Sequence, residues 1–166
     1  MSDAVDAVIA QWGRERPDLD VWPMGVVGRI SRLSRLLGHG LKEFFAEHGL
    51  ENFEFDVLAT LRRSGPPYEL TAGALLKAAM VTSGAITNRI DKMEAKGLVE
   101  RIRDSDDRRS VRIRLTPRGY ALVDELIGLH VANEARMLAA LAPEQREQLC
   151  GLLRVVLESM GDTSID

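Results

Sequence analysis

The sequence predicts a mainly α-helical protein with one small β hairpin. Apolar residues recur at helical spacing through most of the 166 residues. The pattern changes to a strand-like alternation only over residues 98–116. The apolar fraction of 45% is enough for a packed core. The length fits a single domain, or a single domain with added dimerisation helices.

Five helices are expected before the hairpin. The first is a short amphipathic helix over residues 3–12, and the second is a long helix over residues 24–48. A third helix covers residues 53–63 and stops at the turn formed by residues 64–67. Thr71 supplies the cap of the fourth helix.

A fifth helix is expected directly before the hairpin. Thr82 or Ser83 can cap it, and it runs to Lys96. Gly97 follows at the position where a helix end favours positive φ. The residues that face the core, at helical spacing, are Ile86, Ile90 and Met93.

The hairpin and two further helices complete the chain. Its strands are expected over residues 98–103 and 110–116, joined by a polar tip over residues 104–109. Thr116 and Pro117 begin a helix that runs to about Leu141, and a last helix starts at Pro143. The expected architecture is therefore mainly α, with a two-stranded wing and a helical dimerisation region.

The charge of the chain is distributed unevenly. The net charge is −3 and the pI is about 5.7, which alone argues against a nucleic-acid partner. The segment from Thr82 to Arg118, however, holds ten basic and six acidic residues, a net of +4, so the remainder carries −7. A basic segment on an acidic body is typical of a local DNA-binding surface, although a solvated charged face would give the same count.

The order of the elements around this basic segment is that of a winged helix-turn-helix. A short helix, a tight connection, a second helix with a polar face and a basic hairpin follow one another. In such a fold the second helix enters the major groove of DNA. Four polar residues of that helix lie off its apolar stripe and are expected to contact DNA: Ser83, Thr87, Asn88 and Lys92.

The hairpin tip carries a second set of candidate DNA contacts. Arg108 or Arg109 on a narrow ribbon can enter the minor groove, where the negative potential is strongest. Asp106 or Asp107 can orient the guanidinium through a charge-assisted hydrogen bond.

Five short motifs follow one another within residues 24–160: Leu70-Thr71, residues 82–91 (TSGAITNRID), residues 97–101 (GLVER), Asp107-Arg108-Arg109 and residues 115–119 (LTPRG). In this order they resemble the MarR family of transcriptional regulators. The family implies a homodimer on duplex DNA, with residues 1–48 and 117–166 as dimerisation helices and residues 53–116 as the DNA-binding lobe of a single domain. In the family the wing arginine enters the minor groove, and Arg109 is the favoured match. Repression released by a small molecule is the expected outcome.

The first helix is also similar to the added helix of a urate-responsive branch of the MarR family. The branch implies that Trp12, Asp56, Arg89 and Arg101 form the ligand and signalling set. A flat, anionic, purine-like molecule would stack on the aromatic ring and accept hydrogen bonds from arginine. An ion pair between Asp56 and Arg101 would fix the position of the recognition helix, which is the helix expected to enter the major groove. A tricarboxylate or phenolic acid as ligand, or no ligand at all, are the alternatives.

Other functions are less well supported by the sequence. An enzyme would need a positioned acid–base or nucleophile pair, and no cofactor motif or zinc-ligand spacing is present. An adaptor that had lost DNA binding would be expected to lose the wing arginines. Cys150 lies among leucines, which predicts a packed thiol, and a lone cysteine fits a cytoplasmic protein. No signal peptide, membrane span or membrane partner is expected.

Overall fold

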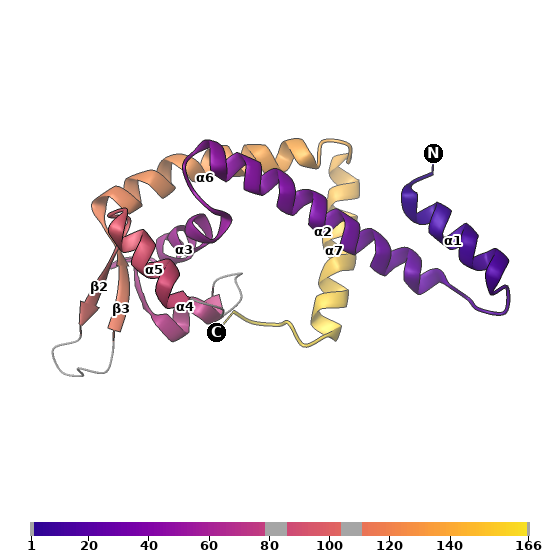
Figure 1. The fold of residues 1–166 in the computed structure, drawn as a ribbon, viewed down its shortest axis with the longest axis horizontal. Helices are drawn as coiled ribbons and strands as arrows, with labels where there is room; N and C mark the ends of the chain where they lie inside the picture. The colour runs from indigo at the N-terminus through magenta and orange to yellow at the C-terminus, as the bar shows by residue number, and fades with distance from the viewer. Residues whose placement is uncertain (1, 79–85, 104–110, 166) are drawn as a thin grey trace. The chain divides into compact units, whose positions relative to one another are not determined.

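The structure is a computed structural model that describes residues 2–78, 86–103 and 111–165. Its contacts divide the chain into two compact units, residues 1–43 and residues 44–166. Each unit is described by itself. Figure 1 gives the labels of the helices and strands.

The first unit consists of helix α1 (Ala4–Glu15) and most of helix α2 (Trp22–Glu47). The Asp3 side chain caps α1 by accepting hydrogen bonds from the Val5 and Asp6 amides. Arg29 of α2 forms ion pairs with Asp3 and Asp6, and Val5 is buried against Gly28. These contacts hold α1 along the first half of α2 (Figure 1).

Helix α1 is longer than the sequence predicts. The sequence pattern places its end at Gly13, but the helix continues through this residue to Glu15, and the Arg16 amide still donates to the Trp12 carbonyl at 2.8 Å. A single glycine lowers helix stability without breaking a helix, whereas the residue before a proline disfavours the helical conformation. Arg16 precedes Pro17, which accounts for the observed end.

The second unit is a helical lobe around a small sheet, and its helices match the expected order. The helices after α2 are α3 (Asn52–Arg63), α4 (Ala72–Ala78), α5 (Ile86–Ala95), α6 (Pro117–Met137) and α7 (Pro143–Ser159). The strands are β1 (Glu69–Thr71), β2 (Val99–Arg103) and β3 (Val111–Leu115). Thr71 caps α4 as expected, because its hydroxyl accepts from the Ala74 amide at 3.1 Å.

The sheet has three strands, not the two that the sequence predicts. The order is β1-β3-β2, and both pairs are antiparallel. Strand β1 pairs Leu70 with Ile113, and the wing strands pair Arg101 with the same residue. A strand of three residues is too short to show an alternating pattern, so β1 is recognised only from its partner.

The core of the lobe lies between α3, α4, α5, the sheet and the first half of α6. Its fully buried residues include Val57, Leu58, Leu61, Leu75, Ile90, Met93, Val99 and Val123. The start of α6 is fixed to the end of α5: the Thr116 hydroxyl caps α6 through the Gly119 amide and donates to the Gly97 carbonyl. Gly119 lies so close to the Leu98 backbone that a side chain there would overlap it. The motif at residues 115–119 therefore joins α6 to the wing.

The apolar faces of three helices remain uncovered in the single chain. No residue of α7 is buried, and Leu152, Val155 and Met160 are 68, 64 and 80% exposed. Cys150 is exposed on this helix, so the predicted packing of its thiol is wrong for the isolated chain. Helices α2 and α6 show the same feature at Val27 and Val131. Among the described helices, none is both long and apolar enough to cross a membrane.

Candidate nucleic-acid interface

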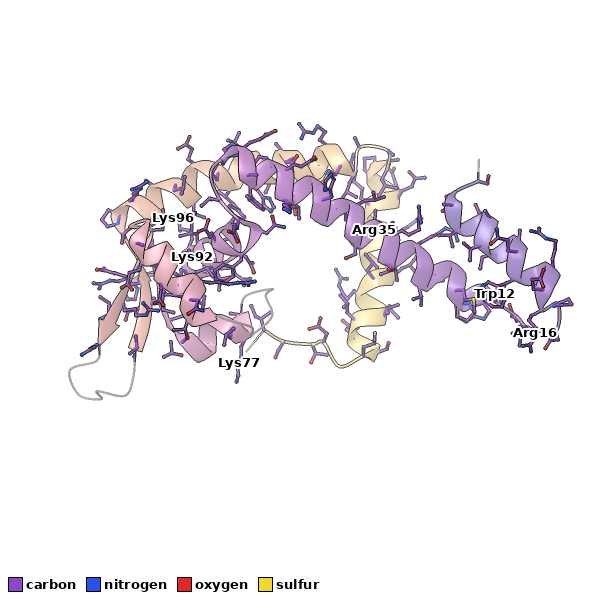
Figure 2. All side chains as sticks on the ribbon, in the orientation of Figure 1. Trp12, Arg16, Arg35, Lys77, Lys92 and Lys96 are labelled. Atoms are coloured by element: carbon purple, nitrogen blue, oxygen red, sulfur yellow. The ribbon has the colours of Figure 1, made fainter. Side chains whose placement is uncertain are left out.

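Helix α5 presents one apolar and one polar face. Ile90 and Met93 are 1% and 0% exposed and fix the helix to the lobe. Thr87, Asn88 and Lys92 of this helix are all exposed. Figure 2 shows Lys92 on this helix, with Lys96 near its end. Short polar side chains and one lysine on an exposed helix can contact base edges and phosphates.

Arg101 of β2 ties the wing to α5. Its guanidinium forms ion pairs with Asp91 at 2.6 Å and with Glu94, and its backbone amide donates to the Glu94 carboxylate at 3.0 Å. A guanidinium nitrogen also lies 3.4 Å from the Thr87 carbonyl oxygen. Burial lowers the pKa of Arg101, but the hydrogen bonds to Asp91 and Glu94 outweigh this and raise it above its ordinary value. The observed link between β2 and α5 is thus made by two acidic residues that no sequence motif marks, and the expected ion pair between Asp56 and Arg101 stays a prediction.

The arginines of strand β3 are partly neutralised by acidic neighbours. Arg112 pairs with Glu69 of β1 at 3.4 Å, and Arg114 pairs with Glu100 of β2 at 3.0 Å. Glu100 is already counted in the net charge of the segment from Thr82 to Arg118, but Glu69 lies outside it and neutralises part of the positive charge of its described residues. Lys92 differs from the strand arginines, because it is exposed and forms no ion pair with the residues that the structure describes.

The comparisons with known proteins agree with this geometry. The model of the MarR family matches residues 50–111, from the link before α3 to the start of β3. The HTH-type transcriptional regulator PecS of Dickeya dadantii is 41% identical over 149 residues, which are 90% of this chain and 90% of that protein. The chain belongs to the MarR family.

Solved structures support the fold of this MarR-family chain. AbsC, a MarR family transcriptional regulator from Streptomyces coelicolor, has a TM-score of 0.76 at 25% identity and covers 87% of this chain and 98% of its own. Sco3205 from the same organism, solved in complex with DNA, has a TM-score of 0.75 at 24% identity over 85% and 89% of the two chains, which shows the fold alone. The predicted winged helix-turn-helix is confirmed. The chain is a DNA-binding transcriptional regulator of the MarR family.

Three of the predicted DNA contacts lie outside the described residues. Ser83 precedes the described part of α5, and Arg108 and Arg109 fall between β2 and β3. The register of the wing nevertheless brings the residues that flank this segment together, because Arg103 pairs with Val111. The roles of these three residues stay predictions.

Of the four residues predicted to bind the ligand, one lies in the first unit of the chain and three lie in the second. Trp12 lies in the first unit, near the end of α1, and 42% of it is exposed (Figure 2). In the second unit the guanidinium carbon of Arg89 lies 4.6 Å from the centre of the Phe53 ring, a cation–π contact between α5 and α3. Asp56 follows Phe53 by three residues and is therefore its neighbour on α3. Arg89 and Phe53 thus join α5 to α3, while Arg101 holds α5 from the wing.

The histidines do not form a metal site in the part of the chain that is described. There, no three metal-ligating side chains come together. His39 is exposed and lies 3.2 Å from Glu43, one helical turn away. His130 packs against the rings of Phe45 and Phe55 and lies 3.3 Å from Glu134.

Proposed function

We propose that the chain works as a homodimer that binds a near-palindromic operator and releases it when a small anionic molecule binds. The observation that carries the proposal is the geometry of α5 within a winged helix-turn-helix: its apolar face packs against the lobe and its polar residues are exposed. In this proposal Thr87, Asn88 and Lys92 contact the major groove together with Ser83. Arg109, and to a lesser extent Arg108, enter the minor groove.

The uncovered apolar faces support a homodimer. A monomeric protein rarely leaves long apolar faces in water. A second copy of the chain supplies matching faces through a two-fold axis, and the recognition helices would then reach half-sites roughly 34–36 Å apart. We therefore expect a dimer at micromolar concentration in sedimentation experiments; a monomer there would contradict this part of the proposal.

Release by an anion is supported by the position of the arginines. Arg101 neutralises two carboxylates on α5, so an anion that binds its guanidinium would compete with Asp91 and Glu94 and loosen the link between wing and recognition helix. BpsR of Bordetella bronchiseptica, whose solved structure has a TM-score of 0.71 at 25% identity, is regulated in its DNA binding by 6-hydroxynicotinic acid. We propose that a flat anion such as urate acts here through Trp12, Asp56, Arg89 and Arg101. A tricarboxylate or a phenolic acid is the second candidate.

The proposal is tested with the DNA upstream of the gene for this protein. Fluorescence anisotropy follows binding of the labelled duplex, and urate, xanthine, trans-aconitate, salicylate and 6-hydroxynicotinate are then added in turn. We expect at least one of these anions to release the DNA. Trp12→Phe combined with Arg89→Ser should bind the duplex and lose the response. Tight binding with no release at millimolar anion would reject the ligand response while leaving DNA binding intact.

A further inference from the structure

Helix α5 ends where three segments of the lobe meet. The Lys96 ammonium, directly after the last residue of α5, lies 2.7 Å from both carboxylate oxygens of Glu54 in the first turn of α3. It also lies 3.4 Å from the carbonyl oxygen of Gly49, in the link between α2 and α3. One side chain thus connects the recognition helix, the α3 helix and the end of a predicted dimerisation helix. Lys96 is labelled in Figure 2.

Glu54 is an unusual residue for this place. It is 4% exposed, although carboxylates are rarely buried unless they are paired. Its carboxylate accepts hydrogen bonds from the Lys96 ammonium and, at 3.0 Å, from the Glu51 amide, so it is paired within the lobe. Ion pairs of this kind add little net stability, because desolvation offsets the attraction, but they fix the relative position of the elements that carry them.

The end of α5 transmits this position to the whole helix. The Leu98 amide donates to the Met93 carbonyl at 3.0 Å and the Gly97 amide donates to the Glu94 carbonyl at 2.8 Å, with Gly97 at φ +69°. This hydrogen-bonded cap makes the helix and Lys96 one rigid piece. Thr87 lies nine residues before Lys96, about 13 Å along the axis, so a tilt of about 5° at the junction displaces it by roughly 1 Å.

We propose that Glu54 and Lys96 are positioning residues for operator recognition. The pair seats α5 at the angle that brings Thr87 and Asn88 to the base edges and Lys92 to a phosphate, and neither member of the pair contacts DNA. The proposal rests on the operator binding proposed above. The competing explanation is that Lys96 binds a DNA phosphate directly and that Glu54 only neutralises it.

The two explanations predict opposite changes in DNA affinity for Glu54→Gln. If charge alone matters, Glu54→Gln removes a negative charge from the lobe and strengthens DNA binding, whereas Lys96→Met weakens it. If the pair positions α5, both substitutions weaken binding to the specific sequence. Each should then lose roughly tenfold in affinity, the value of about one base contact, while affinity for random DNA stays within about threefold.

The test uses the full-length protein and two duplexes of equal length, one selected by the wild-type protein from a random-sequence library and one scrambled. Dissociation constants and their salt dependence are measured for wild type, Glu54→Gln, Lys96→Met and Lys96→Arg. Lys96→Arg keeps the ion pair and should keep the preference for the selected duplex. Asp124→Asn is the matched control: it removes the same charge from another ion pair, which joins Asp124 to Arg62 of α3 and leaves α5 untouched. It should bind both duplexes like wild type.

Circular dichroism establishes that each variant is folded. If a single variant is unfolded, the double variant Glu54→Gln/Lys96→Met decides, because removing both charges leaves no unpaired charge at the buried Glu54 position. A folded Glu54→Gln, or a folded double variant, with wild-type or higher preference for the selected duplex overturns the proposal. So does a salt slope for Lys96→Met that falls by about one, which would mark a lost phosphate contact. A wild-type protein that prefers no duplex would instead refute operator binding itself.

Discussion

Gly119 offers a direct test of how the wing is joined to α6. A Cβ at this position would overlap the Leu98 carbonyl oxygen and lie 2.9 Å from the Leu98 carbonyl carbon. That oxygen accepts a hydrogen bond from the Thr116 amide at 3.2 Å, so it cannot turn away freely. Both colliding groups are backbone, and no change of rotamer relieves the contact. We therefore expect Gly119→Ala to destabilise the protein.

The expected magnitude is a difference of two opposing effects. Overfilling a packed site costs up to about 3 kcal/mol, and the upper end applies because backbone must move. Alanine in place of glycine within a helix stabilises the folded state by about 1 kcal/mol. The net loss of about 2 kcal/mol corresponds to a fall in Tm of about 4–8 °C for a chain of this size.

Thermal unfolding followed by circular dichroism measures this effect. Gly128→Ala is the control in the same helix, because an added Cβ there meets no atom within 4 Å. It should gain about 1 kcal/mol and unfold a few degrees above wild type. Helix propensity alone predicts the same sign for both variants. If Gly119→Ala unfolds at or above the wild-type temperature, the close approach between α6 and Leu98 is refuted.

Three further predictions concern the DNA contacts and the first helix. Lys92→Ala should weaken binding to all sequences alike and lower the salt slope by about one, and an unchanged slope would show that Lys92 contacts no phosphate. Arg109→Ala, and to a smaller degree Arg108→Ala, should weaken operator binding without lowering Tm. If both variants bind the operator with wild-type affinity, the wing arginines do not contact DNA. Hydrogen bonds from the backbone at Asp6 and from Arg29 lower the pKa of Asp3, so its stabilising contribution is present above the ordinary carboxyl pKa and is lost as the pH falls below about 4. Hydrogen exchange of the α1 amides should then lose protection as the pH falls through this range, unlike that of α6, whose cap is the neutral Thr116 hydroxyl.

The elements that the sequence predicts best are those with long, regular patterns. Helix α3 is expected over residues 53–63 and is observed over Asn52–Arg63. The alternation of Val111, Ile113 and Leu115 predicts β3, because apolar residues on one face of a strand must reach the core. Strand β1 is missed, since its assignment depends on a neighbour more than 40 residues away in the chain.

The contacts of the site are harder to predict for the same reason. Glu54 and Lys96 are 42 residues apart, and no local pattern marks a buried carboxylate. Arg101 is expected to act on the recognition helix, but its observed partners, Asp91 and Glu94, look in the sequence like ordinary surface charges. The burial of Cys150 is wrongly predicted because an apolar neighbourhood on α7 does not show whether the same chain covers it.

The reading of DNA by α5 is tested most directly by measuring, for the wild-type protein and for Asn88→Ala, the preference for the selected over the scrambled duplex at physiological salt. We expect the wild-type protein to bind the selected duplex at least roughly 10³-fold more tightly than the scrambled one. Asn88→Ala should lose a factor of about ten of that preference and bind the scrambled duplex as before, because an exposed asparagine on α5 reads bases and carries no charge. Equal binding of both duplexes by the wild-type protein, or an unchanged preference in Asn88→Ala and in Thr87→Ala, would contradict the claim that this face of α5 reads DNA.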